Sequence, residues 1–198
     1  MRPALPGHLT RPPEGRFRFV AVDVETARRW SGSICQIGLA FVDDARIETY
    51  STLVDPRCAF DAGNVRVHGI RPADVRGAPG FAEALETLRP VLEGHPLVAH
   101  SRFDQRAFER ACADHRIRSL DAAWSDSVRI ARKAWPELRG AGGGHGLANL
   151  KRVLGLRFRH HDAGEDARAC AQVTVAAEGV LGTIPALRWR HEQLELDV

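Results

Sequence analysis

Apolar residues in the first part of the chain follow the patterns of β-strands. They are nearly continuous over 17–23 and again over 34–42, whereas they alternate with polar residues over 46–54. Continuous apolar runs are typical of strands covered on both faces, and alternation is typical of strands with one buried face. Because Asp43-Asp44 supplies a short turn between the second and third runs, the pattern predicts an antiparallel meander of three strands.

Apolar residues in the remainder of the chain recur mostly at helical spacing. Phe81, Ala84, Leu85 and Leu88 form one such face, which stops at Gly94, a residue type that often follows a helix. The pattern predicts helices over 81–92, 104–115, 127–135, 146–154 and 163–181, with short strands at 97–100 and 122–124. Three strands followed by alternating helices and strands predict an α/β fold, a mixed five-stranded sheet flanked by helices.

Four stretches lack such periodicity. Residues 1–16 are rich in Pro, Gly and Arg and are expected to form a flexible tail, and residues 183–198 form a C-terminal extension of unassigned role. The stretch after Pro56 is expected to be irregular, and the glycine-rich stretch Gly140–Gly146 is expected to be a flexible loop. One folded domain over 17–182 follows.

Composition narrows the class of protein. A chain of 198 residues, 44% hydrophobic, can bury one sizeable core. Its formal net charge is +3, of which the first sixteen residues contribute +2, so nucleic-acid binding would have to come from a local site. The four cysteines are scattered, and no signal-peptide core or apolar stretch of about 18 residues exists. These features predict reduced thiols, a cytoplasmic location and no membrane contact.

Two carboxylates stand at the end of the first predicted strand. Asp23 and Glu25 are two residues apart, so in an extended strand they point the same way with Cα atoms roughly 6.5 Å apart. Like charges at that range repel and raise each other's pKa, and a divalent cation would relieve the repulsion. The alternative is a solvated strand end that runs into a turn.

Three further residues carry candidate chemistry. Asp104 lies where the short strand 97–100 meets the next helix, a place where ligands of α/β sheets gather, although it could also be a helix N-cap. Asp162 and Glu165 resemble a capping box that starts the last helix. His161 then lies in the loop before that helix and Asp166 in its first turn, which suits a mobile base beside a rigid ligand. A surface pair is the alternative.

Together these residues resemble the DEDDh 3′ to 5′ exonucleases, the family that includes the epsilon proofreading subunit of bacterial replicases and ribonuclease T. The resemblance covers about residues 17–182. It rests on Asp23-Val-Glu-Thr26, Ser33-Ile-Cys-Gln-Ile-Gly38, Val67-His-Gly-Ile70, Val98-Ala-His100 with Phe103-Asp104, and His161 with Asp166. Where many members read His-Asn-x-x-Phe-Asp, this chain has His100-Ser101-Arg102-Phe103-Asp104, which is one residue shorter and lacks the Asn.

The resemblance implies a ribonuclease-H-like fold, two Mg²⁺ or Mn²⁺ ions and stepwise removal of 3′-terminal nucleotides. It implies that Asp23 bridges the ions, that Glu25 and Asp166 complete one site, and that Asp104 supports the other. Four carboxylates carry −4, which two divalent ions would neutralise. His161 would take the proton from the attacking water.

Four other residues are assigned by context. Thr26 and His68 are candidates for holding the terminal nucleotide, although Thr26 could simply end its strand and His68 could hydrogen-bond the backbone of its turn. His100 is expected to be structural, and His160 is expected to be incidental, because His161 has the spacing to Asp166 that the family requires.

The predicted function is a metal-dependent exonuclease that acts on single-stranded or frayed 3′ ends of DNA. An RNA-trimming exoribonuclease or oligoribonuclease of the same fold is one alternative, since nothing in the sequence reads a 2′-hydroxyl. A catalytically idle module that binds nucleic acid or a polymerase partner is another. The sequence leaves open the choice between proofreading, repair and RNA processing, and also the oligomeric state.

Overall fold

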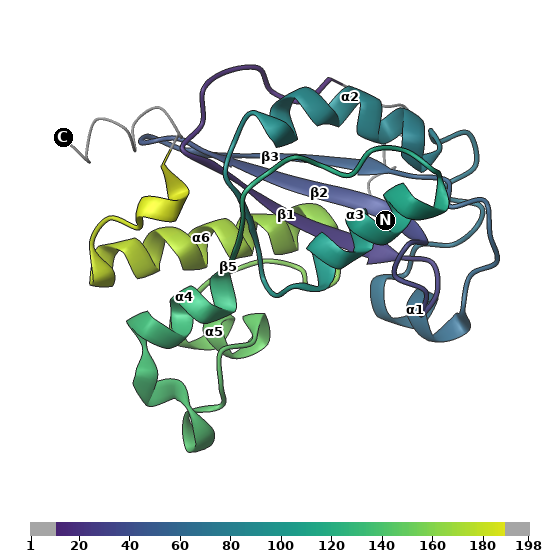
Figure 1. Cartoon of the computed structure of the whole chain (residues 1–198). Helices are drawn as coiled ribbons and strands as arrows, with labels where there is room; N and C mark the ends of the chain where they lie inside the picture. Colours follow the sequence, from purple (N-terminus) through teal and green to yellow (C-terminus); the bar gives the residue numbers. More distant parts are fainter. Residues whose placement is uncertain (1–10, 189–198) are drawn as a thin grey trace.

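The computed structural model describes residues 11–188, which form a mixed sheet between helical layers (Figure 1). The strands are β1 (Phe19–Thr26), β2 (Ile34–Val42), β3 (Ile47–Leu53), β4 (Leu97–Ala99) and β5 (Trp124–Asp126). Their order in the sheet is β3-β2-β1-β4-β5, with β1 antiparallel to β2 and parallel to β4. The predicted meander and mixed five-stranded sheet are confirmed.

Six α-helices accompany the sheet in the described part of the chain. They are α1 (Ala62–His68), α2 (Phe81–Glu93), α3 (Phe103–Asp114), α4 (Ser127–Ala134), α5 (Leu147–Val153) and α6 (Ala163–Leu181). Figure 1 shows α2 and α3 on one side of the sheet and α6 on the other, with α4 and α5 projecting away from it as a lobe. Short 3-10 turns lie at Pro136–Leu138, Gly140–Gly142 and Pro185–Leu187.

Alternation along β1 sorts its side chains between the two helical layers. Val20 and Val22 pack in the core under α2 and α3, whereas Phe19 and Ala21 pack in the core under α6. Side chains two residues apart on a strand share a face. Asp23 and Glu25 therefore continue the face that α6 covers.

A glycine on β2 lets α6 approach that face closely. A Cβ atom at Gly38 would lie 2.0 Å from the backbone carbonyl of Ala163, the first residue of α6. Gln36, also on β2, accepts a hydrogen bond at 3.2 Å from the backbone N–H of Ala163 through its side-chain oxygen. These contacts fix the start of α6 beside the end of β1.

Several sequence predictions need correction. The stretch after Pro56 is not wholly irregular, because α1 forms there and ends at Gly69 with a left-handed φ of 75°. Helical periodicity is weak in α1 since His68 is its only buried residue. The first strand runs on to Thr26 because β2 continues to pair with it beyond Asp23.

The glycine-rich stretch contains local structure that the sequence did not predict, and its flexibility stays a prediction. It contains a 3-10 turn, and the side chain of Asn149 donates hydrogen bonds of 2.8 and 2.7 Å to the carbonyls of Gly142 and Gly144. Residues 1–10 of the predicted tail and 189–198 of the predicted extension lie outside the described residues. Leu187, within the extension, packs beside Phe19 in the core under α6.

The cysteines form no disulfide, as predicted. All four cysteines are free thiols, and Cys35, Cys112 and Cys170 are buried. None of the helices formed within residues 11–188 is both long and apolar enough to cross a membrane.

Candidate active site

The first feature of the site is the end of β1, which outruns its parallel neighbour. The pairing of β1 with β4 stops at Val22 and Ala99. Beyond that point the Asp104 side chain takes over, and its Oδ1 accepts a hydrogen bond at 3.1 Å from the backbone N–H of Val24. Asp104 is 4% exposed and lies in the first turn of α3, whose N-cap is Arg102. Asp104 is thus not the helix cap, and its carboxylate is fixed at the strand end.

The second feature is the start of α6. Asp162 is its N-cap and accepts a hydrogen bond from the backbone N–H of Glu165, as predicted. Asp166 follows in the first turn, is 3% exposed, and accepts a bond of 2.7 Å from the backbone N–H of His161. The helix start therefore orients Asp166 toward β1.

These elements bring the predicted carboxylates together. Asp23, Glu25 and Asp166 each place one carboxylate oxygen within 4.8 Å of the others. Together with Asp104 and His161 they line a small depression of about 290 Å³. Residues that are far apart in the sequence thus share one site.

Burial and mutual repulsion strongly affect the ionisation of these carboxylates. Burial, followed by the charges of Asp104 and Asp166, raises the pKa of Asp23 well above its usual range. Burial and the charges of Asp166 and Asp104 raise the pKa of Glu25 to about 8. Burial, reinforced by the charge of Asp166, raises the pKa of Asp104 to about 7. The cluster resists carrying its full negative charge without a cation.

The donor set suits a divalent metal ion. Mg²⁺ and Mn²⁺ prefer oxygen ligands, with carboxylates foremost among them. Three carboxylate oxygens within 4.8 Å of one another supply such ligands. Asp23 and Glu25, whose pKa values are raised, would regain their charge on binding a cation. Asp23, Glu25, Asp104 and Asp166 therefore fit the predicted metal site.

The two histidines before α6, His160 and His161, make contacts that the sequence did not predict. His160 Nδ1 lies 2.8 Å from Asp166 Oδ1, and its ring stacks on that of His161 with centroids 4.3 Å apart. The prediction that His160 is incidental is thus wrong, because its ring contacts a carboxylate of the site. His161 is exposed at the rim with a left-handed φ of 65°, and burial together with the charge of His160 lowers its pKa.

His100 has the structural role that was predicted. Its Nε2 lies 3.0 Å from the carbonyl of His145, so this nitrogen carries the proton, and its Nδ1 accepts a 2.7 Å hydrogen bond from the Ser127 hydroxyl. Burial lowers the pKa of His100 to about 4. A neutral His100 joins the end of β4 to the glycine-rich stretch.

Thr26 and His68 lie together at the C-terminal end of β1, just beyond Glu25. His68 is buried, its Nε2 lies 3.2 Å from the Thr26 carbonyl, and its Nδ1 accepts from the backbone N–H of Ile70. Asn64, which the sequence did not single out, donates to the same Thr26 carbonyl at 2.9 Å. Both ring nitrogens of His68 are thus engaged within the chain, and contact with a substrate stays a prediction for both residues.

The shortened His100–Asp104 stretch makes a strained connection. Ser101 has a φ of 144°, which L-residues rarely adopt, and its hydroxyl accepts from the backbone N–H of Phe103. Phe103 is 46% exposed and lines the depression. The sequence reasoning missed Phe103 as a site residue, although an aromatic residue next to Asp104 could have drawn attention to it.

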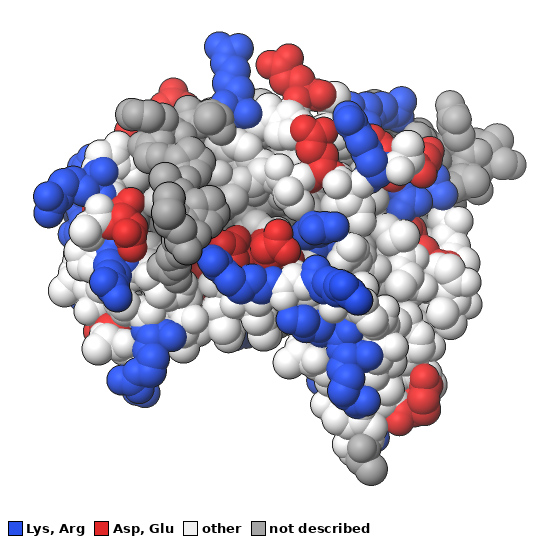
Figure 2. All heavy atoms as spheres, turned by 180° about the vertical axis from the view of Figure 1, so that it is seen from behind, with Lys and Arg blue, Asp and Glu red and all other residues white. Residues whose placement is uncertain are grey.

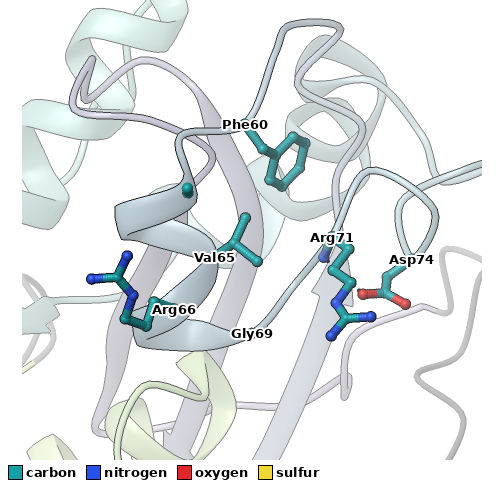
Figure 3. Close-up of a pocket in the computed structure, with 7 residues that line it drawn as sticks. Phe60, Val65, Arg66, Gly69, Arg71 and Asp74 are labelled. Carbon is teal, nitrogen blue, oxygen red and sulfur yellow. Dashed lines mark hydrogen bonds between the residues drawn. The ribbon is translucent and has the colours of Figure 1, made fainter.

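A larger hollow lies beside α1, away from the carboxylates (Figure 3). Its volume is about 830 Å³, and its lining includes Phe60, Val65, Arg66, Arg71 and Asp74. None of the predicted site residues lines it. Asp74 accepts from the backbone N–H of Arg71 and is the single carboxylate of the lining, so this hollow lacks the paired acids of the depression.

Comparisons with known proteins show what this chain is similar to in sequence and in fold. A DNA polymerase III subunit epsilon-like protein from Rhodobacter capsulatus is 30% identical over 190 residues, covering 92% of this chain and 26% of the relative. The chain thus spans about a quarter of that relative's length. Exonuclease X in complex with 5′ overhanging duplex DNA superposes with a TM-score of 0.67 at 20% identity, covering 88% of this chain and 99% of that one.

A second solved structure has the same fold. The nuclease domain of 3′hExo, described as a DEDDh family member bound to rAMP, gives a TM-score of 0.65 at 16% identity, covering 80% of this chain and 90% of that one. The family model described as Exonuclease (RNase_T) matches residues 20–174, which include every predicted site residue. The predicted resemblance is confirmed, and the chain belongs to this exonuclease family, whose members are phosphodiester hydrolases.

Proposed function

We propose that the protein is a divalent-metal-dependent 3′ to 5′ exonuclease that removes nucleotides from single-stranded or frayed 3′ ends of DNA. The observation that carries the proposal is the close approach of Asp23, Glu25 and Asp166, with His161 at the rim of the same depression. Members of the family depend on divalent metal ions. In this chain the acidic cluster is the place where such ions would bind.

The carboxylates would share the work of holding two ions. Asp23 would contact both, Glu25 and Asp166 would complete one site, and Asp104, held by the backbone of Val24, would support the other. Bound divalent ions would supply positive charge at both the attacking and the leaving oxygen of an in-line displacement. The contact from His160 Nδ1 keeps the Asp166 carboxylate in a fixed orientation.

His161 would act as the general base. Its lowered pKa keeps the imidazole neutral near pH 7, so that a ring nitrogen can accept the proton of the attacking water. Because His161 is exposed, it can pass that proton to solvent. Its place in a loop outside α6 leaves it freer to move than Asp166.

The preference for DNA is supported by relatives rather than by a contact. One relative is named as epsilon-like, and one solved neighbour is a complex with duplex DNA. The neighbour bound to rAMP favours RNA trimming as the second candidate. The name of the relative also motivates a polymerase partner for this protein. An inactive binding module is the third reading, and the intact acidic cluster speaks against it.

The proposal is tested with matched 5′-labelled DNA and RNA oligonucleotides in Mn²⁺. We expect a descending ladder of labelled products, formed faster from DNA, and no reaction in excess chelator. A faster ladder from RNA would favour the exoribonuclease. Absence of shortening with any divalent metal would reject the enzymatic proposal and leave the binding module.

A further inference from the structure

A groove opens next to the depression and is lined by basic side chains. It has a volume of about 730 Å³ and lies between the start of α3, the strand β5, the helix α4 and the segment after α6. In Figure 1, β5 lies next to α4, and the segment after α6 is drawn in yellow. Ser101 lines both the groove and the depression, so the two hollows adjoin.

Three cations face this groove. They are Arg102 at the N-cap of α3 and Arg129 and Lys133 on α4. All three are exposed, and none of their charged groups forms an ion pair with another described residue. Arg129 and Lys133 are four residues apart and thus lie on one face of the helix.

The acidic group in the groove is already engaged. Asp126 is the N-cap of α4, and its Oδ1 accepts hydrogen bonds from the backbone N–H groups of Val128 and Arg129 at 2.8 and 3.2 Å. The remaining wall is largely apolar and includes Trp124, Ile130 and Ile184. Free cations beside an apolar and aromatic wall suit a strand of nucleic acid, with phosphates on the cations and bases against the wall.

The charge of the surrounding lobe favours the same occupant. Residues 127–159, which we call the basic lobe, contain eight Lys and Arg and one Glu, a formal charge of +7, whereas the rest of the chain carries −4. Figure 2 shows Lys and Arg side chains on this projecting lobe and at its base. Such a local excess attracts phosphate chains.

We propose that the groove holds the single-stranded segment of nucleic acid that leads to the 3′ end in the depression. This inference rests on the proposed function. The phosphates of that segment would lie against Arg129 and Lys133. A peptide that pairs with the free edge of β5 is the competing occupant, but it would leave the three cations without a partner.

The test compares Lys133→Glu with Arg132→Glu in the full chain. Arg132 is an exposed neighbour on α4 that does not line the groove, so the two variants carry the same change of charge on the same helix. Binding of a long fluorescent DNA strand and of a trinucleotide is measured by anisotropy with Ca²⁺ present, over a range of salt concentrations. Thermal melts check that both variants fold.

We expect Lys133→Glu to weaken binding of the long strand about tenfold and to flatten its salt dependence by about 0.7 in slope, the value of one phosphate contact. Arg132→Glu should change it less than about twofold, and the trinucleotide should lose less affinity than the long strand. Equal losses for both variants, or a loss that is independent of strand length, would overturn the groove. Because binding needs no cleavage, an inactive wild type would reject the proposed function without deciding this inference.

Discussion

The acidic depression and the basic lobe differ in how deeply their charged side chains are buried. Asp104 and Asp166 are buried, fixed by backbone N–H groups and close to other carboxylates, so that burial and repulsion shift the ionisation of their neighbours. Arg129 and Lys133 are exposed and without ion pairs among the described residues. The net charge of +3 for the whole chain conceals both regions.

This difference indicates in which region a substitution should affect function most. A buried group with a fixed geometry can act on bond-making atoms, and small displacements are costly. Solvated charges attract and guide a polyanion, and each is worth little alone. We therefore expect the largest effects in the depression, and smaller effects that depend on salt in the lobe.

The largest effect is expected from Asp23→Asn. Burial and the charges of Asp104 and Asp166 raise the pKa of Asp23, and we propose that this carboxylate contacts both ions. Loss of its charge should lower kcat about 10³-fold or more, since bound ions supply several kcal/mol of charge stabilisation. Steady-state cleavage of DNA with Mn²⁺ measures it. Glu25→Gln is the matched control, and a milder effect of Asp23→Asn than of Glu25→Gln would contradict the assignment.

The next effect separates His161 from His160. His161→Ala should lower kcat about 10²-fold or more by removing the base, while binding of DNA and metal is retained. His160→Ala should cost about tenfold, because it removes only the contact that orients Asp166. A larger loss for His160→Ala would move the base to the neighbouring ring, and equal cleavage by all three proteins would contradict the catalytic role of His161.

A structural change tests how α6 reaches β1. Gly38→Ala places a Cβ atom 2.0 Å from the Ala163 backbone, so the helix has to shift. Overpacking of this kind costs about 1–3 kcal/mol, or several degrees in the melting temperature. Gly63→Ala is the control, because Gly63 lies in α1 with open space around it and should tolerate the change. Unchanged melting of Gly38→Ala would mean that α6 is not held there.

The smallest effect is a pH dependence of stability in the metal-free protein. The pKa of Glu25 is raised to about 8, so the folded state holds a proton that the unfolded chain releases near pH 4. The protonated carboxyl group of Glu25 therefore stabilises the folded state fully below about pH 4, and this stabilisation is lost as the pH rises towards 8. Melting temperatures should fall by a few degrees between pH 5 and pH 8 without metal, and the gain on adding Mn²⁺ should grow over the same range. Glu25→Gln should flatten the metal-free trend; an equally steep trend in that variant would contradict the assignment.

Local patterns in the sequence account for much of the site. Strand alternation predicts that Asp23 and Glu25 share a face, and the capping box at Asp162 predicts that Asp166 lies in the first turn of α6. What these patterns omit are long-range contacts. The backbone of Ala163 needs Gly38 on another strand, and the choice between His160 and His161 depends on a turn with a left-handed φ.

The short helix α1 could not be predicted for a related reason. It buries only His68, so the sequence has no apolar stripe there to detect. The charge of the basic lobe, in contrast, could have been counted from the sequence. It was overlooked because the net charge of the chain after residue 16 is close to zero. Net charge is therefore informative when it is counted separately for each region of the chain, and the fold determines which regions lie next to one another.

The most direct test of the central claim is cleavage of a 5′-labelled DNA strand by the wild type and by Asp23→Asn, with Mn²⁺, with chelator, and with Mn²⁺ restored. We predict a ladder that shortens from the 3′ end for the wild type, that disappears in chelator and returns with the metal, and that is absent for the variant. A ladder of equal strength from Asp23→Asn, or one that persists in chelator, would contradict the assignment of the acidic depression as the metal-dependent active site.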